Sequence, residues 1–329
     1  MTRARWYPER PKVIEGEMTE RRTGNAVRAQ RRDDGRRIGS WLTAAAVVLN
    51  VLQLFALPLS LLPRDAAWGW VLLPLALLTT TFWSVIHEAV HGNLHHRRAR
   101  NDRYGRVLGV LYGSPFVLLK AGHLLHHRYS RTRERAEIYD PATSSWVRAA
   151  PGYYLRLFGG LYLLEVAALA LAVLPIAAVR GLARAVDGPD TVAGPLLERI
   201  AQAEVFRQFR VDAFAITVLY CAAFLAYGSH WWILSAALAG RAVIVSLSDN
   251  AYHYGTDLDE PLEALNLRLP APLEMLTLSF NLHGTHHRRP GLRWYELRPA
   301  FDAEDGRYDC GWSRAVVRQI RGPIASADR

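Results

Sequence analysis

The chain has 329 residues, half of them hydrophobic, and its 40 arginine and lysine residues exceed its 30 acidic residues by a formal net charge of +10. Many of the hydrophobic residues lie in long uncharged runs, which excludes an ordinary soluble core and indicates an integral membrane protein. The basic residues border these runs, as expected for cytoplasmic loops, so the charge does not predict a nucleic-acid partner. Cys221 and Cys310 form no CxxC pair, which fits a reducing cytoplasmic face.

The N-terminal segment, residues 1–37, holds ten arginines and Lys12 against six acidic residues, with few apolar positions. Such a composition cannot bury a core, so we interpret the segment as a basic, mobile cytoplasmic tail. Residues 38–329 are predicted to form a single membrane domain.

Two apolar runs follow the tail. No charged residue lies between Ile38 and Pro63 or between Ala66 and Ile86. Each run is long enough for a helix that crosses about 30 Å of hydrocarbon. We therefore predict spans over residues 38–63 and 66–90, joined by a turn too short for anything but a helical hairpin. Five arginines between positions 97 and 106 favour the cytoplasm for the end of the second span.

Two later runs are predicted not to cross the membrane. The run from Val107 to Lys120 has 14 residues and is interrupted by glycine and proline, which favours an interfacial or re-entrant segment. The run over residues 155–179 contains Gly159-Gly160 and Glu165 and is followed by arginines. It is expected to be a shallow interfacial helix or a re-entrant hairpin.

The last two apolar runs, residues 211–227 and 231–247, predict an out-and-back pair of spans. A charge within a span usually faces the bundle interior, and Arg241 is expected to do so. The predicted fold is therefore an all-α integral membrane helical bundle of about four spans plus interfacial helices, under a histidine-rich cap for two metals. Both termini and the cap are expected in the cytoplasm, and a bacterial inner membrane is the expected location.

Three histidine clusters predict a metal centre. They read His87-Glu-Ala-Val-His91, His123-Leu-Leu-His126-His127 and His283-Gly-Thr-His286-His287. Residues three or four apart share one face of a helix, so each cluster can direct its imidazoles at one place. Histidine is the commonest metal ligand in proteins. With His253, which follows the last span, nine histidines are expected at the cytoplasmic end of the helix bundle. Nine are enough for two metals with four or five imidazoles each.

Polar residues beside the clusters are candidates for orienting the rings. Glu88, Asp249 and Asn250 are predicted to do so, because an imidazole-only site carries the metal charge without compensation. His95 and His96 lie in an arginine-rich stretch and are expected to be solvated or to face lipid headgroups. His230 is expected in the non-cytoplasmic turn.

Together the three boxes, with Arg288-Arg289-Pro290 and Trp294-Tyr295 after the last one, resemble the membrane fatty acid desaturase superfamily. The resemblance covers about Trp41 to Leu297. This superfamily also includes alkane hydroxylases, carotenoid ketolases and hydroxylases, and fatty acid decarboxylases that form terminal alkenes.

The resemblance implies a non-haem di-iron centre that uses dioxygen and external electrons to attack an unactivated C–H bond. It implies iron ligands at His87, His91, His123, His126, His127, His253, His283, His286 and His287. Its further implications are a fatty acyl or other lipid substrate and a separate electron donor of the ferredoxin, rubredoxin or cytochrome type. Acyl-CoA desaturases have HxxxxH in the first box and an Asn where this chain has Asp249, which argues against that branch.

Desaturation of a fatty acyl chain is the predicted reaction, and two alternatives stay open. The same metal cage also serves a hydroxylase or ketolase and an oxidative decarboxylase that gives a terminal alkene. The first box also matches HExxH, in which two histidines bind zinc and the glutamate acts as general base. An intramembrane zinc protease would use only His87, Glu88 and His91, and would leave the other two clusters unexplained.

Overall fold

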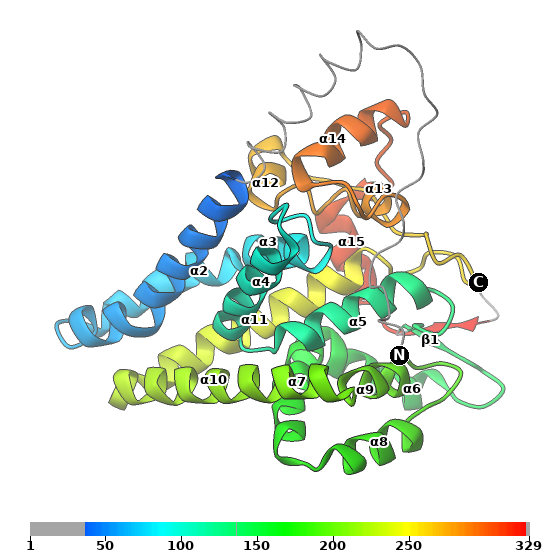
Figure 1. The fold of residues 1–329 in the computed structure, drawn as a ribbon. Helices are drawn as coiled ribbons and strands as arrows, with labels where there is room; N and C mark the ends of the chain where they lie inside the picture. Colours follow the sequence, from blue (N-terminus) through cyan, green and yellow to red (C-terminus); the bar gives the residue numbers. More distant parts are fainter. Residues whose placement is uncertain (1–36, 136, 327–329) are drawn as a thin grey trace, which may run out of the picture.

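The computed structural model describes residues 37–326 except Ala136. The predicted mobile tail therefore lies outside the described residues, apart from Arg37. The described chain is mainly helical, and Figure 1 shows long helices on one side and a cap of short helices and loops on the other.

The described part of the chain begins with a helix over Arg37–Leu61, which ends in the π-helix η1 (Leu52–Leu61). The helices that follow are η2 (Ala66–Val71), α2 (Leu72–Leu77), α3 (Thr79–Val90), α4 (Arg98–Tyr112), α5 (Phe116–Tyr129), α6 (Trp146–Leu155), η3 (Arg156–Gly160), α7 (Leu161–Ala167), η4 (Ala168–Val173), α8 (Ile176–Ala185), α9 (Ala193–Ile200), α10 (Ala203–Tyr227), η5 (Gly228–His230), α11 (Trp231–Ala251), α12 (Ala271–Leu276), α13 (His283–Arg288), α14 (Trp294–Ala303) and α15 (Trp312–Gln319). Two parallel strand pairs join β1 (Ile138–Tyr139) to β4 (Ile324–Ala325) and β2 (Leu267–Arg268) to β3 (Cys310–Gly311).

Several of these helices could cross a membrane. In the described part of the chain, the stretches Arg37–Leu61, Trp146–Val173 and Ala203–Ala251 are long and apolar enough. Two bent pairs, Ala66–Leu77 with Thr79–Val90 and Arg98–Tyr112 with Phe116–Tyr129, raise the number of candidate spans to five. The predicted number of about four lies inside this range and stays a prediction.

The helix over Trp146–Val173 bears on the prediction that residues 155–179 do not cross. Its length and composition would allow a crossing. It is broken within η3, where Gly159 has a φ of 119°, a left-handed conformation that favours glycine. A side chain at Gly159 would also meet Ala242 of α11 at 3.1 Å. The predicted Gly159-Gly160 interruption is thus a kink that lets this helix pack closely against α11.

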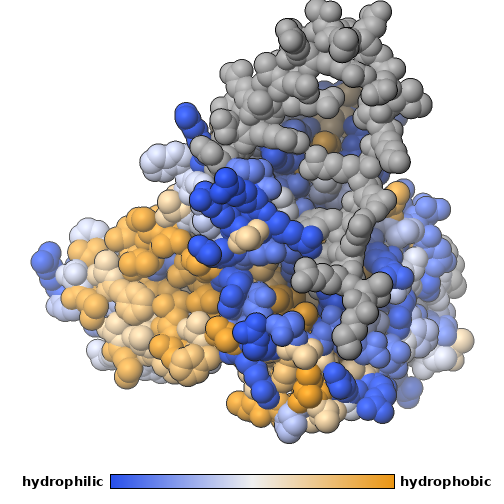
Figure 2. Space-filling model, viewed as in Figure 1, coloured by the Kyte–Doolittle hydropathy of each residue, from blue (hydrophilic) through white to orange (hydrophobic). Residues whose placement is uncertain are grey.

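The long helices meet at the end that lies farthest from the cap. Figure 1 shows α10 and α11 as the two arms of a hairpin, with the first helix and α2 beside them. Leu54 and Leu57 of the first helix pack there against Tyr227 and Leu234, and the Tyr227 hydroxyl donates to the Gln53 carbonyl at 2.8 Å. Figure 2 shows this half of the molecule covered by hydrophobic residues, as a bilayer requires.

The turn between α4 and α5 bends the chain by 102° inside this apolar region. Gly113 ends α4 in a left-handed conformation with a φ of 98°. The last carbonyls of a helix have no partner within it, and in hydrocarbon an unpaired carbonyl costs several kcal/mol. Here the Tyr220 hydroxyl donates to the Leu111 carbonyl at 2.8 Å, and the Tyr162 hydroxyl and the Arg241 guanidinium donate to the Tyr112 carbonyl at 2.6 and 3.1 Å.

Arg241 therefore faces the bundle interior, as the sequence predicts, and its partner is the end of a helix. A cation at a helix C-terminus is stabilised by the helix dipole. The guanidinium also lies over the rings of Phe82 and Tyr112, at 5.8 and 5.7 Å from their centroids. Arg241 thus holds the turn between α4 and α5 that leads into the second histidine box on α5.

The substitution Arg241→Leu should lower the free energy of unfolding by about 2 kcal/mol, because a charge-assisted hydrogen bond to a buried carbonyl is lost. The matched control is Arg184→Leu on α8, where the arginine is exposed and the expected change is within about 0.5 kcal/mol. Thermal unfolding of both variants in detergent measures the difference. Equal melting temperatures would show that Arg241 does not hold the turn.

Candidate metal centre

All nine histidines named from the sequence converge beneath the cap. They are His87 and His91 at the end of α3, His123, His126 and His127 on α5, His253 in the turn after α11, and His283, His286 and His287 on α13. Among the described residues they form two groups. In each group, one nitrogen from every ring lies within 4.8 Å of the corresponding nitrogens of the other rings. The five-imidazole group consists of His87, His91, His123, His127 and His286, and the four-imidazole group of His126, His253, His283 and His287.

Helix geometry explains this division. In α5, His123 and His127 belong to one group and His126 to the other. In α13, His283 and His287 belong to one group and His286 to the other. Each residue turns a helix by about 100°, so two residues four apart differ in direction by only about 40°. The residue directly before the second of them points about 100° away from it and about 60° away from the first. Each HxxHH box therefore gives two rings to one group and one ring to the other.

Within each group the ring nitrogens follow one another in a row. The Nε2 atoms of His91, His123, His127 and His286 are separated by 3.0 Å at each step. Those of His126, His253, His283 and His287 are separated by 3.1, 3.2 and 3.1 Å.

Hydrogen bonds between the rings can account for at most two of the three short contacts in each row. A ring nitrogen offers either one proton or one lone pair, so a nitrogen that faces two neighbours can pair with only one of them. The Nε2 atom of His87 is also buried and has no hydrogen-bond partner among the described residues. Nitrogens bound at about 2.1 Å and at right angles around one ion lie about 3.0 Å apart, as these do. The residues therefore fit two metal ions.

The electrostatics of the rings supports the same conclusion. Burial lowers the pKa of His253, His283, His286 and His287 well below the ordinary value, and neighbouring histidines lower it further. Burial and the charge of Lys120 lower the pKa of His91 to about 3. These imidazoles are neutral at physiological pH and keep the lone pairs that a metal ion needs.

The two groups share a border. The rings of His127 and His287, one from each group, stack with their centroids 4.3 Å apart. His283 and His286 occupy the same helix turn and point into different groups. Two ions held by these groups would therefore lie side by side.

A carboxylate that was not singled out in the sequence orients one of the rings. The Glu134 Oε2 atom lies 2.7 Å from the Nδ1 atom of His126. Burial alone would raise the pKa of Glu134, but His126, Arg156 and Arg131 together lower it to about 2, so the carboxylate is charged. Such a partner holds a ligating ring in one tautomer and one orientation. Glu134 lies beyond the end of α5 at Tyr129, so no helical spacing relates it to His126 and the sequence does not reveal it.

The three residues predicted to orient the rings have other contacts. Glu88 is buried beside His87, and its carboxylate accepts the backbone N–H of Trp294. Asp249 lies 3.9 Å from the Arg156 guanidinium. The Asn250 amide donates to Gln319 Oε1 at 2.8 Å and to the Tyr153 hydroxyl at 3.3 Å. The Asn250 amide thus joins the end of α11 to the C-terminal segment, and its role toward the rings stays a prediction.

His95 also differs from its prediction, because it is buried and not solvated. The loop after α3 folds back on this helix, since the buried Asn101 donates to the Ala89 carbonyl at 2.7 Å and accepts from the His95 backbone. The His95 ring packs against His96 and Tyr104, outside both metal groups. His96 is exposed, as predicted.

A family comparison agrees with this site. The family model described as fatty acid desaturase matches residues 66–319, most of the chain, including all nine histidines. The chain belongs to the fatty acid desaturase family. Members are membrane oxidoreductases that act on fatty acids. Comparison with curated proteins and with solved structures gives no match.

His253 and His95 make a matched pair for testing the ligands of this desaturase-family protein. Both are buried, but only His253 belongs to a metal group. His253→Ala should lower the affinity for one metal ion by more than the 10–100-fold that loss of an outer partner costs. His95→Ala should change stability alone, by about 1–3 kcal/mol. Metal titration and thermal unfolding distinguish them, and equal metal loss in both variants would contradict the assignment.

Glu134→Gln should weaken metal binding about 10–100-fold, because the neutral amide no longer fixes the His126 ring. The control is Glu274→Gln, which also alters a carboxylate of the cap but one bonded to Arg298 and Asn281. Metal affinity measured by competition with a chelator reports both effects. An unchanged affinity in Glu134→Gln would exclude this role.

Proposed function

We propose that the protein is a membrane-bound oxidoreductase that holds two iron ions and uses dioxygen and external electrons to desaturate a fatty acyl chain. The observation that carries the proposal is the pair of adjoining imidazole groups within a chain of this family. Iron bound there would supply the reductive activation of dioxygen that an unactivated C–H bond demands.

The donor set favours iron over zinc. Structural zinc is almost always four-coordinate, and catalytic zinc has three protein ligands and a water. Five imidazoles in one group exceed that number. Imidazole suits iron, and iron accepts more ligands while leaving a position for dioxygen.

The surrounding residues position the site and exclude water. Trp83 precedes His87 by one helical turn, and its ring lies 6.2 Å from that of His123. The Phe280 ring lies 4.9 Å from that of His87. Both aromatic rings therefore pack against the cage and place apolar surface beside it. We propose a separate electron donor of the ferredoxin, rubredoxin or cytochrome type, as the resemblance to this family implies.

Hydroxylation, ketolation and decarboxylation use the same ligands, and they differ in how the substrate lies against the iron ions. The zinc protease alternative is less consistent with the geometry. His87 and His91 share their group with three further imidazoles, and Glu88 is engaged by the Trp294 backbone.

The proposal is tested by expression in a bacterial membrane with iron and a deuterated fatty acid. Mass spectrometry of the lipid extract should show a fatty acyl chain lighter by two deuterium atoms or hydrogens, the mark of a new double bond. His286→Ala is the inactive control, because it removes one ligand of the five-imidazole group. A gain of one oxygen or a terminal alkene would instead assign the alternative reactions. Unchanged lipids from iron-loaded protein with a competent electron donor would contradict the proposal.

A further inference from the structure

A buried ion pair lies behind the four-imidazole group. Arg131, five residues beyond His126, is among the largest fully buried side chains of the protein. Its Nη1 atom donates to Glu137 Oε1 at 2.7 Å, and Glu137 is equally buried. Burying a charged pair is costly unless hydrogen bonds satisfy its remaining polar atoms. The partners that supply these bonds indicate what the pair does.

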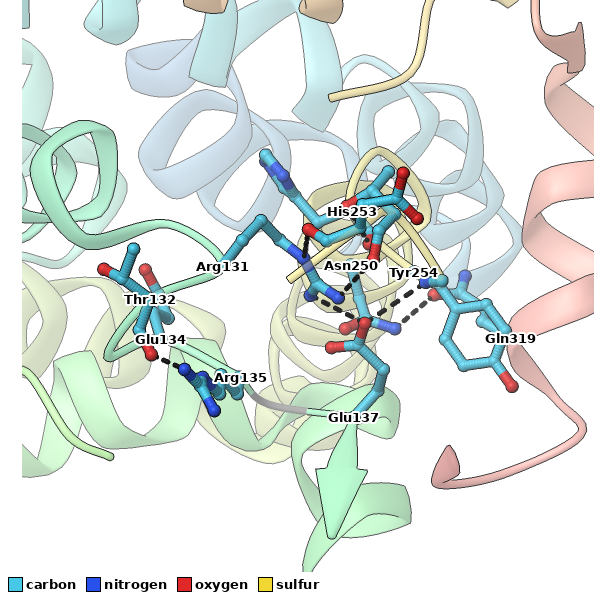
Figure 3. A network of polar contacts seen from close by, with 12 residues as sticks. Arg131, Thr132, Glu134, Arg135, Glu137, Asn250, His253, Tyr254 and Gln319 are labelled. Atoms are coloured by element: carbon cyan, nitrogen blue, oxygen red, sulfur yellow. Dashed lines mark hydrogen bonds and ion pairs between the residues drawn. The ribbon is translucent and has the colours of Figure 1, made fainter. Parts of the chain in front are cut away.

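Those partners belong to the turn that carries His253. Arg131 Nη2 donates to the Thr256 carbonyl at 2.7 Å, and Arg131 Nε donates to the Asp257 carbonyl at 3.4 Å. Glu137 Oε1 accepts the backbone N–H of Gly255 at 3.1 Å. Figure 3 shows Arg131 and Glu137 beside the turn that includes His253 and Tyr254. The pair thus fixes three consecutive residues of this turn to the segment that follows the second histidine box.

The C-terminal segment holds the same turn from its other side. Gln319 is fully buried, accepts from Asn250 and donates to the Leu247 carbonyl at 2.9 Å, both near the end of α11. The Tyr254 hydroxyl donates to the Gly322 carbonyl at 2.8 Å. Further on, the Ile324 N–H donates to the Glu137 carbonyl at 2.7 Å, where β4 pairs with β1.

His253 needs this support more than the other eight histidines do. They lie on α3, α5 or α13 or directly at the end of α3, so helix backbone sets their positions. His253 lies two residues beyond the end of α11, in a turn. Nothing in that turn is regular secondary structure, and the contacts of Arg131, Glu137 and the C-terminal segment determine where the ring stands.

We propose that Arg131 and Glu137, together with the C-terminal segment from Gln319 to Ala325, are positioning residues for His253 and so set the affinity of only one of the two metal sites. The five-imidazole group contains no residue of this turn and keeps its metal when the pair is removed. The inference rests on the proposed function, since it treats both groups as metal sites.

The test is the double variant Arg131→Met with Glu137→Leu. Replacing both members of a buried ion pair by apolar residues of similar volume often leaves a fold intact, whereas removing one member strands a buried charge. The control is Arg106→Met with Asp212→Leu, which replaces the ion pair between α4 and α10. Purified proteins are loaded with iron, passed over a desalting column and analysed for iron per chain.

We expect about two irons per chain in the unmodified protein and in the control, and about one in the Arg131/Glu137 variant. The remaining ion should show the electron paramagnetic resonance of an isolated ferric centre, which a coupled ferric pair lacks. Adding His253→Ala to the variant should remove no further iron, because it affects the same site. Adding His87→Ala should remove the last iron.

Arg131→Lys gives a second test that keeps the charge beside Glu137. An ammonium cannot match the forked guanidinium that bonds Glu137 and two carbonyls, so binding of the second iron should weaken at least 10-fold. Two tightly held irons in both variants, or equal loss from both sites with the fold intact, would overturn the inference. Absence of iron from the unmodified protein would instead refute the proposed function.

Discussion

Eight of the nine imidazole rings have Nε2 atoms that lie 3.0–3.2 Å from that of a neighbouring ring, and the rest of the fold is arranged around holding all nine. Hydrogen bonds between the rings account for only some of these contacts, and metal ions that received the lone pairs of neutral rings would satisfy the others. Three helices and one turn therefore have to meet at fixed angles. Metal ions held by both groups would tie these helices and the turn together and so make the cap more rigid.

The membrane imposes the second constraint. Backbone groups inside hydrocarbon must find partners within the protein, yet the chain has to turn there to bring α5 beneath the cap. Arg241, Tyr162 and Tyr220 solve this by donating to the final carbonyls of α4. Outside the apolar region, short irregular segments are held in another way. The turn that carries His253, for example, is fixed by side-chain contacts and lies beside a pair of two-residue strands.

The histidine spacing was sufficient to name eight members of the two groups, because residues three and four apart on a helix share a face, and His253 was added because it follows the last apolar run. The division into five and four could not be derived, since it depends on the angles at which α3, α5 and α13 meet. Glu134 and Arg131 were missed for a related reason: both lie in irregular chain beyond α5, where no periodicity relates a residue to the ring it supports. His95 was placed in solvent because its neighbours are arginines, whereas the fold buries it through Asn101, six positions away.

Hydropathy alone does not decide how many of the apolar helices cross the membrane. The stretch Trp146–Val173 is apolar enough to cross, and its kink at Gly159 reflects close packing against α11. Composition alone does not separate these two properties. The requirement that all histidine boxes share one side of the membrane supplies a constraint that hydropathy lacks.

X-ray absorption at the iron edge distinguishes a di-iron centre from a zinc site, because it reports the ligands and the neighbouring metal together. We expect about two irons per chain, surrounded by nitrogen at about 2.1 Å and each with a second iron nearby. One zinc ion per chain with four or fewer ligands would contradict it, and would show that the first histidine box acts without the other two.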